Sequence, residues 1–587
     1  MSKTDKAYFT RKMFLKAVLP APLAAIGLAI AEMGDAILVG HAIGMNGLAA
    51  IAFTSPLFLL ANFFVFGLSM GGAIVYTNLM TTGKKEEAQK VFNFFFRLSI
   101  LIGLTISTSC FVFEENLLMF LGVDPSDVIV YDMTKSYTFY VLLAIPLQIL
   151  LVLLCNFLIN DDAETFSTVV ISSSGALNLI LSALLLLIFD WGVEGCSFGF
   201  FLSYFLSLMV TIGFIIFRKE GELSFRGKSI SWKESVKPLR LGFATSSEYI
   251  FDAVFTLIFI HLLVEIDGNE GVAIFNVIEN LSILFIFIYE LIGKTSQPLF
   301  STFFAEKNFN ELHRVFKYSL IYSLLIGTLA TILVVLYPQI LGFLFGLDDI
   351  ENVAKFYYAA RIFCIGTIFM GVCLLLQNYL QSKEDEGSAF LVVFMRRIGA
   401  SIPLVYILVQ FGFNAIWFAY PLSEVVTLIV LLFYKRRKDK QTKIDTSRIY
   451  SATFNDSIED LTEQIAEIKT FAEKWGATKI KINTLRLALE ETWRLVTENK
   501  QNSEESLLIQ LTLAAHEDGT FQLNIRNNGK IIDLLKNHED NTEFQLFDKG
   551  EYHQTELSTV LMQIAKKRAY QFLYRKSHDF STLTITI

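Results

Sequence analysis

The chain has 587 residues, of which 53% are hydrophobic and only 18% are charged, and its mean hydropathy is +0.49. This composition excludes a disordered chain, a small disulfide-stapled secreted domain and an ordinary soluble globule, and it indicates a membrane protein. The net charge of −8 and the lack of a basic stripe give no reason to expect nucleic acid as a partner.

Charge is unevenly distributed along the chain. Lys, Arg, Asp and Glu make up about 15% of residues 1–440 and about 27% of residues 441–587. The second value is ordinary for a soluble domain, and the first is not. We therefore expect a large membrane domain followed by a small water-soluble one. The five cysteines lie in apolar stretches without a CxxC pair, so we expect no metal site and no cofactor.

Twelve apolar runs are long enough to cross a bilayer as helices. They lie at residues 14–39, 48–78, 91–113, 136–157, 166–189, 195–217, 239–264, 271–297, 318–337, 356–380, 388–410 and 415–434. Alternate loops and the two ends hold 24 Lys and Arg residues, whereas the opposite loops hold only Lys135 and Lys355. Because cytoplasmic loops carry the basic excess, we expect a multi-pass protein of the cytoplasmic membrane with both termini in the cytoplasm.

The two halves of the membrane region resemble each other. The segment KKEEAQKVFNFFFRLSILIG around Val91 corresponds to NFNELHRVFKYSLIYSLLIG around Val315, 224 residues later. Polar and apolar positions both agree, which favours duplication over chance similarity. Six spans per repeat leave a cleft between two lobes of equal orientation, as alternating-access transporters require. The predicted parts are an N-lobe (1–217), a cytoplasmic linker (218–238) and a C-lobe (239–440).

Several short motifs carry a family resemblance. They are Glu32-Met-Gly-Asp35 with Val39-Gly40, Gly47–Ala50 with Pro56, Leu177-Asn178, Gly192–Gly195 and Gly293–Pro298. In order and spacing these motifs resemble the multidrug and toxic compound extrusion (MATE) family. The resemblance implies twelve transmembrane helices in two six-helix lobes. It also implies a secondary active efflux transporter, not an enzyme, that exports an organic cation or drug-like molecule in exchange for H⁺ or Na⁺.

Asp35 is the first candidate for cation coupling. A carboxyl group within a span is costly by a few kcal/mol, so it usually faces an internal cavity. The resemblance implies coupling at this acid, with Asn178 supporting it from the fifth span. The family's second Asp, one helical turn after the Asn, is Ser182 here, which favours H⁺ over Na⁺. The alternative is a structural Asp that is hydrogen-bonded to a neighbouring helix.

The C-lobe offers further acidic residues. Glu248 and Asp252 are four residues apart on one face of the seventh span, and we expect them to form a second, paired coupling site. Glu279 and Glu290 on the eighth span are candidates for the substrate cleft. The alternative is structural pairing with nearby basic residues, namely Arg361, Arg396 or Lys294.

Residues 441–587 are expected to form a small α/β domain. Helices are predicted at 457–475, 484–499 and 555–573, and strands at 506–514, 520–526 and 580–587. With Leu485–Glu491 and Ile525–Gly529, this order resembles the ATPase module of histidine kinases and anti-sigma factors, known as the GHKL or Bergerat fold. The resemblance implies nucleotide-binding-like positions at Glu491, Asn527 and Gly529.

Three departures from that module argue against catalysis. Leu495 replaces the Asn that holds Mg²⁺, Asn527 replaces the Asp that reads adenine, and Thr555–Ser558 replaces the Gly-rich phosphate lid. We therefore expect a non-catalytic pseudo-ATPase domain that regulates transport, by binding either a nucleotide or a cytoplasmic protein.

Two other functions fit the same features. The first is a flippase for lipid-linked precursors, which requires basic residues inside the cleft. The second is a membrane sensor whose C-terminal domain signals to a soluble partner. Flux of a small molecule separates transport from sensing, because a sensor binds its ligand without moving it across the membrane.

Overall fold

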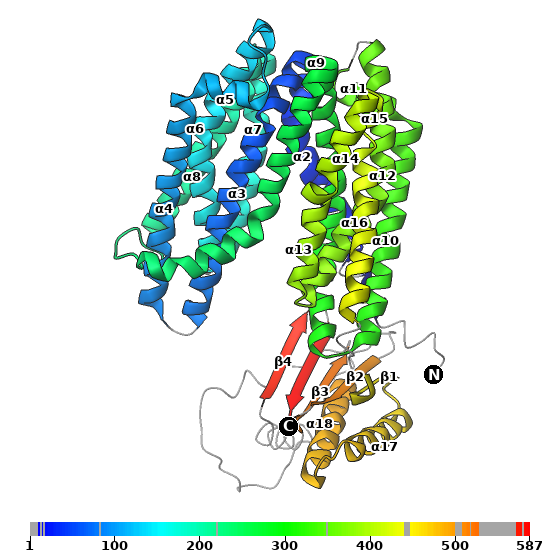
Figure 1. The fold of residues 1–587 in the computed structure, drawn as a ribbon. Coiled ribbons are helices and arrows are strands. Elements are labelled where there is room, and N and C mark those ends of the chain that lie inside the picture. The colour runs from blue at the N-terminus through cyan, green and yellow to red at the C-terminus, as the bar shows by residue number, and fades with distance from the viewer. Residues whose placement is uncertain are drawn as a thin grey trace.

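The chain forms a helical membrane domain of two lobes, with a small domain of helices and strands at one end (Figure 1). The computed structural model describes residues 10–11, 14–15, 18–81, 84–161, 163–218, 221–347, 350–439, 446–498, 508–516, 518–527, 571–577 and 580–587. Among these, ten helices are long and apolar enough to cross a membrane. One of them, Ser246–Ala305, covers two predicted spans, because its backbone turns at Gly268 (φ 65°). The protein is therefore a multi-pass membrane protein.

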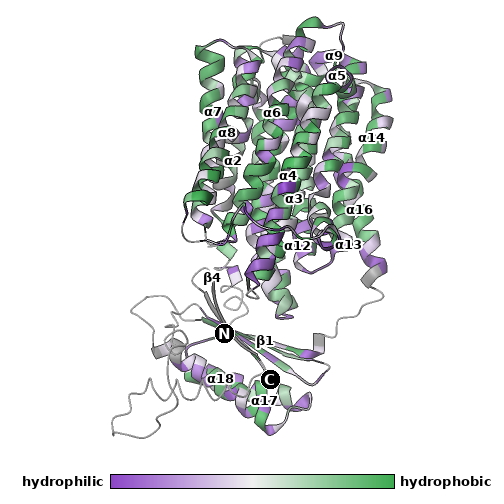
Figure 2. Ribbon diagram, turned by 90° about the vertical axis from the view of Figure 1, so that its left-hand side faces the viewer, coloured by the Kyte–Doolittle hydropathy of each residue, from purple (hydrophilic) through white to green (hydrophobic). Residues whose placement is uncertain are grey.

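The helices lie where the apolar runs predict them. The N-lobe contains α2 (Ala21–Ala42), α3 (Met45–Thr81), α4 (Lys85–Val112), α5 (Glu114–Leu121), α6 (Val128–Ile159), α7 (Glu164–Ala183), the π-helix η1 (Leu184–Ile188) and α8 (Val193–Phe217). The C-lobe contains α9 (Trp232–Ala305), α10 (Phe309–Leu336), α11 (Pro338–Leu344), α12 (Ile350–Ser382), α13 (Glu386–Phe394), the π-helix η2 (Met395–Gly399), α14 (Ser401–Leu408), η3 (Val409–Phe411), α15 (Phe413–Ile416) and α16 (Ala419–Asp439). Apolar residues predominate along these helices, whereas α17 and α18 of the small domain are mixed (Figure 2).

The two lobes are joined at the end of the membrane domain that lies away from the small domain. The core of the C-lobe includes Phe53 from α3 and Leu118 from α5, which belong to the N-lobe. Asn269, at the turn of α9, donates a 2.6 Å hydrogen bond to Asp127, which precedes α6. At Gly40, a Cβ would lie 2.1 Å from a backbone oxygen of the α11–α12 connection, so only glycine permits this approach.

The small domain is an antiparallel sheet with helices on one face. Its elements are η4 (Thr446–Arg448), β1 (Ile449–Asn455), α17 (Ile458–Lys474), α18 (Lys479–Glu498), β2 (Leu508–Ala515), β3 (Phe521–Asn527), β4 (Gln571–Ser577) and β5 (Phe580–Thr586). The strand order is β1-β2-β3-β5-β4, with every neighbouring pair antiparallel. Leu511 and Ile525 are paired across β2 and β3, and both belong to the core beneath α17 and α18.

The sequence predicted this domain in part. Both helices at its start and the strands β2, β3 and β5 are confirmed, whereas β1 was not predicted. The prediction of a helix at 555–573 is wrong at its C-terminal end, because residues 571–573 belong to β4. This segment, Gln-Phe-Leu-Tyr, is rich in residues that favour strands, and it pairs with β5 through Phe572 and Ile585. Residues 555–570, with most of that helix, lie outside the described residues.

Candidate functional site

In the N-lobe, Asp35 and Asn178 meet between α2 and α7. Asn178 Nδ2 donates a 3.0 Å hydrogen bond to Asp35 Oδ2, and Ser182, one turn further along α7, lies 3.4 Å from the amide oxygen of Asn178. The helices approach closely here because residue 34 is glycine; a Cβ at that position would lie 2.3 Å from a methyl group of Leu179. The structure therefore brings together the acid and the amide that the sequence placed in this lobe.

The second oxygen of Asp35 gives this site its chemical character. Asp35 Oδ1 is buried and has no hydrogen-bond partner among the described residues. A buried carboxylate oxygen without a partner is costly in a low-dielectric environment, unless it carries a proton or contacts a cation. The arrangement can therefore hold one small cation or proton at Oδ1, while Oδ2 is fixed by Asn178.

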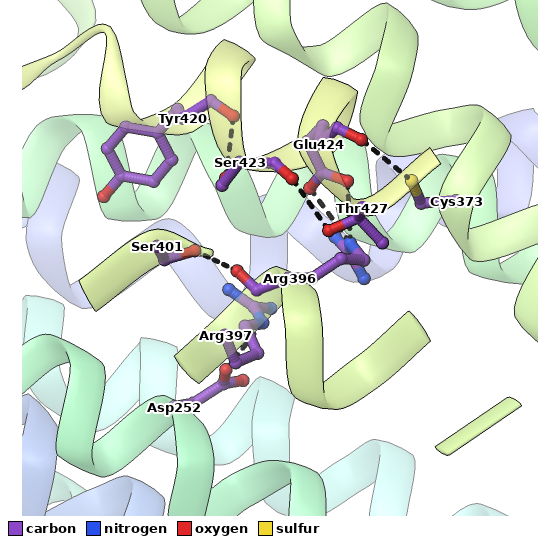
Figure 3. A network of polar contacts seen from close by, with 9 residues as sticks. All are labelled: Asp252, Cys373, Arg396, Arg397, Ser401, Tyr420, Ser423, Glu424 and Thr427. Atoms are coloured by element: carbon purple, nitrogen blue, oxygen red, sulfur yellow. Dashed lines mark hydrogen bonds and ion pairs between the residues drawn. The ribbon is translucent and has the colours of Figure 1, made fainter. Parts of the chain in front are cut away.

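In the C-lobe, two adjacent arginines pair with acids from two different helices (Figure 3). Arg396 Nε lies 3.0 and 2.9 Å from the two carboxylate oxygens of Glu424 on α16. Arg397 Nε lies 2.6 Å from Asp252 Oδ1 on α9. Both arginines belong to the π-helix η2, whose wider turn alters the side-chain directions of a regular helix. Ser401 donates a hydrogen bond to the Arg396 carbonyl oxygen at this irregularity.

Both arginines and Glu424 line a small cavity in the C-lobe. Its lining combines charged, hydroxyl and aromatic groups: Phe255, Ser282, Met370, Arg396, Arg397, Ser401, Ala419, Tyr420, Ser423 and Glu424. Its volume of about 20 Å³ holds one water molecule, so a larger ligand could contact this lining only after the helices move apart.

The other three acidic candidates of the C-lobe each have a different partner. Glu248 accepts a 3.3 Å hydrogen bond from Gln377, and Glu290 forms a 2.7 Å ion pair with Lys294. Glu279 accepts a 2.8 Å hydrogen bond from Ser55 on α3, which belongs to the other lobe. Glu248 and Asp252 therefore share a helix face but not a common bonding partner.

The nucleotide-binding-like positions lie in the small domain. Glu491 on α18 and Asn527 at the end of β3 are both buried, and Arg494 lies 3.5 Å from Glu491. Gly529 lies outside the described residues.

The sequence interpretation counted Arg397 among the possible basic residues of the cleft and Glu424 as a weak acidic candidate, but it assigned neither its partner and did not consider Ser55. The signal for the first was present, since Arg396 and Arg397 are two adjacent charges in the middle of an apolar run. No periodic pattern pointed to Ser55, because its partner belongs to the other repeat.

Comparison with known proteins supports this architecture. A sequence model of the family described as MatE matches residues 20–184 and again residues 242–407, in register with the predicted repeat. The probable multidrug resistance protein YoeA of Bacillus subtilis (strain 168) is 21% identical over 454 residues, which cover 74% of this chain and 94% of that protein.

Solved structures share the fold at low sequence identity. An inward-facing multidrug resistance MATE family transporter of the MOP superfamily superposes with a TM-score of 0.67 at 17% identity, covering 73% of this chain and 99% of that one. A MOP superfamily transporter from Pyrococcus furiosus, described as having a binding pocket of reverse polarity, has a TM-score of 0.57 at 17% identity, with 74% and 97% covered.

Proposed function

Since the chain belongs to the MatE family of membrane transporters, we propose that it is a secondary active efflux transporter that exchanges a cation for an amphipathic, cationic small molecule. The observation that carries this proposal is that the two carboxyl oxygens of Asp35 have different environments. One oxygen is held by Asn178, and the other is buried without a partner among the described residues. A site of this kind gains its missing interaction when it binds a proton or small cation.

The neighbours of Asp35 favour H⁺ over Na⁺ as the coupling ion. Hard cations in proteins are held by several oxygen ligands, usually with more than one carboxylate. Here the hydrogen-bonding groups beside Asp35 are the amide of Asn178 and the hydroxyl of Ser182, and the nearest carboxyl group on α2, that of Glu32, belongs to an exposed residue. A single carboxyl group with such neighbours is sufficient to bind and release a proton.

The charge balance of the C-lobe favours a cationic substrate. Arg396 and Arg397 are neutralised by Glu424 and Asp252. Glu279 is hydrogen-bonded to a serine, and no ion pair involves it among the described residues. The acids therefore outnumber the bases, which is unfavourable for the anionic head group that a lipid-linked precursor would present. Aromatic residues such as Tyr420 add ring faces that attract organic cations.

The proposal places the C-terminal domain in the cytoplasm as a non-catalytic regulator. The basic residues of the alternate loops support cytoplasmic termini. In this orientation, export moves the substrate away from the side of the membrane on which the C-terminal domain lies. Residues 40 and 127 contact the C-lobe at the opposite end, so the lobes are closed there. Glu491, Asn527 and Gly529 are the positions at which a nucleotide would be recognised.

Transport of a fluorescent organic cation into everted membrane vesicles tests the proposal. Acidification of the vesicle lumen should drive uptake of the fluorescent cation. A higher Na⁺ concentration inside the vesicles than outside, without a pH gradient, should not. Asp35→Asn should reduce uptake at least about tenfold, because it removes the group that a proton titrates. Asp132→Asn is the matched control, since this carboxyl group is exposed on α6. No uptake by the wild type, or equal uptake by Asp35→Asn, would contradict the proposal.

A further inference from the structure

The sheet of the C-terminal domain has two faces of opposite character. Leu511, Leu523 and Ile525 point into the core beneath α17 and α18. The residues that alternate with them form the polar sheet face, which consists of Gln510, Thr512, Asn524 and Arg526. The polar face of an antiparallel sheet normally lies in water. Here each of the four residues is at most 3% exposed, so another part of the chain covers them.

An ion pair lies at the centre of this covered surface. Arg526 pairs with Glu306, which follows directly after α9, and the two side chains are only 4% and 7% exposed. The guanidinium group also lies 4.7 Å from the ring centroid of Phe303 and donates a 2.9 Å hydrogen bond to Gln510. A guanidinium group that is paired, hydrogen-bonded and stacked in this way is a specific contact and not a loose surface association.

Two contacts beside the ion pair extend the same surface. Asn308 Nδ2 donates a 2.8 Å hydrogen bond to Thr512 Oγ1, and both residues are buried. Lys307 Nζ lies 3.1 Å from His516 Nδ1. Three consecutive residues of the α9–α10 junction therefore each contact the C-terminal domain.

The same surface reaches the segment that leads into α2. Thr10 donates a 2.6 Å hydrogen bond to Glu311 on α10, and Gln510 Nε2 lies 3.5 Å from the Thr10 hydroxyl. Further along, Phe14 and Val18 belong to a cluster of buried residues with α9 and α10, and Tyr322 donates a 3.0 Å hydrogen bond to the Leu19 carbonyl oxygen. The start of this helical segment is therefore fixed to the C-lobe where the C-terminal domain is attached.

Helix α2 connects this attachment point to the coupling acid. At its beginning, Ala25 packs in the C-lobe cluster with α9 and α10. At Gly34 and Asp35 the same helix contacts α7 of the N-lobe. A displacement of α2 at its first end must therefore alter either its packing against the C-lobe or the contact between Asp35 and Asn178.

We propose that the polar sheet face is a docking surface for the α9–α10 junction of the same chain, and that docking restrains α2 and slows transport. Docking and the restraint of α2 rest on the contacts alone. The effect on transport rests, in addition, on the proposed function. Docking adds a contact from Gln510 to Thr10, whose hydroxyl already donates to Glu311 of the C-lobe, and rocking of the lobes must overcome this extra contact. A cytoplasmic ligand or protein that binds the C-terminal domain and displaces it from the junction would accelerate transport.

Reversible cross-linking of the full-length protein tests docking directly. Cysteines replace Asn308 and Thr512 in a Cys110→Ser background, because the other four native cysteines are buried. Mild oxidation should join this pair efficiently as a disulfide, because the two side chains contact each other directly and need no linker. It should not join cysteines at Asn308 and Thr462, since Thr462 is exposed on α17. Equal yields from the two pairs would overturn the docking surface.

Two further measurements test the restraint. The cross-linked protein should transport at least about fivefold more slowly, with recovery after reduction. Glu306→Arg places two cations together without altering the C-terminal domain, so it should raise the transport rate and accelerate hydrogen exchange in α2. Adding Arg526→Glu should reverse both effects, whereas Lys469→Leu on α17 should have neither. Unchanged hydrogen exchange of α2 in Glu306→Arg would overturn the restraint, whether or not the variants transport. Absence of transport in every variant would instead contradict the proposed function.

Discussion

Ser55 on α3 donates a 2.8 Å hydrogen bond to Glu279 on α9, and this contact joins the two lobes of the membrane domain. The acceptor is a half-buried carboxyl group, and no basic residue is paired with it among the described residues. A cationic group that enters between the lobes can therefore bind Glu279 without displacing a salt bridge. The hydrogen bond itself must break or rearrange when the lobes separate at this level.

Glu279→Gln should weaken the binding of cationic substrates. The amide preserves the shape and the hydrogen bond from Ser55 but removes the charge, so we expect KM to rise roughly tenfold with a smaller change in kcat. Transport rates at several concentrations of a fluorescent cation measure this effect. Glu270→Gln is the matched control, because that side chain is 57% exposed. An unchanged KM in Glu279→Gln would exclude this residue from the substrate site.

The pair formed by Arg396 and Glu424 should be important for stability. Arg396→Leu leaves a buried carboxylate without its cation, which should cost about 3–5 kcal/mol. The double variant Arg396→Leu with Glu424→Leu should be considerably more stable than the single one, since both charges are removed together. Thermal unfolding in detergent compares the variants, with Lys84→Leu as a control at an exposed pair. A double variant as unstable as the single one would contradict this interpretation.

The fold was largely predictable because each membrane helix has a long apolar signature. The contact between Asp35 and Asn178 also follows from the family resemblance, which placed both on neighbouring helices. The directions of Arg396 and Arg397 could not be predicted, because they depend on a π-helix for which the sequence gives no distinct signal. Glu248 and Asp252 show the limit of helical periodicity. Spacing places them on one face, but the partners Gln377 and Arg397 come from other helices.

The docking of the C-terminal domain was also beyond sequence interpretation. Alternation along β2 and β3 correctly separates apolar from polar residues. A polar face normally indicates contact with water, and only the three-dimensional structure shows that the α9–α10 junction covers it.

Close helix contact at Gly242 should make this position intolerant of substitution. A Cβ there would lie 1.9 Å from the Gly67 carbonyl oxygen on α3, and a backbone atom cannot move aside as a side chain can. We expect Gly242→Ala to destabilise the protein by about 1–3 kcal/mol. Gly175→Ala is the control, because nothing lies within 4 Å of a Cβ at that position. Equal melting temperatures for the two variants would show that α3 and α9 can separate at no cost.

Removal of Arg526 should make docking dependent on pH. Glu306 lies outside the membrane-spanning helices; burial raises its pKa, and the positive charge of Arg526 opposes this effect. In Arg526→Leu the opposing charge is absent, so the pKa of the docked Glu306 rises further above that of the undocked group. The docked state then binds the proton more tightly, which favours docking at low pH and weakens it as the pH rises through the raised pKa.

The cross-linking yield between cysteines at positions 308 and 512 measures this dependence. In Arg526→Leu the yield should be near that of the unsubstituted protein under acidic conditions and should fall several-fold toward neutral pH. Glu306→Gln, added to Arg526→Leu, removes the titrating group and should abolish the pH dependence while retaining the contact surface. A pH dependence that persists without Glu306 would assign it to another group, of which Glu311 is a candidate because Arg526 also acts on its carboxyl group.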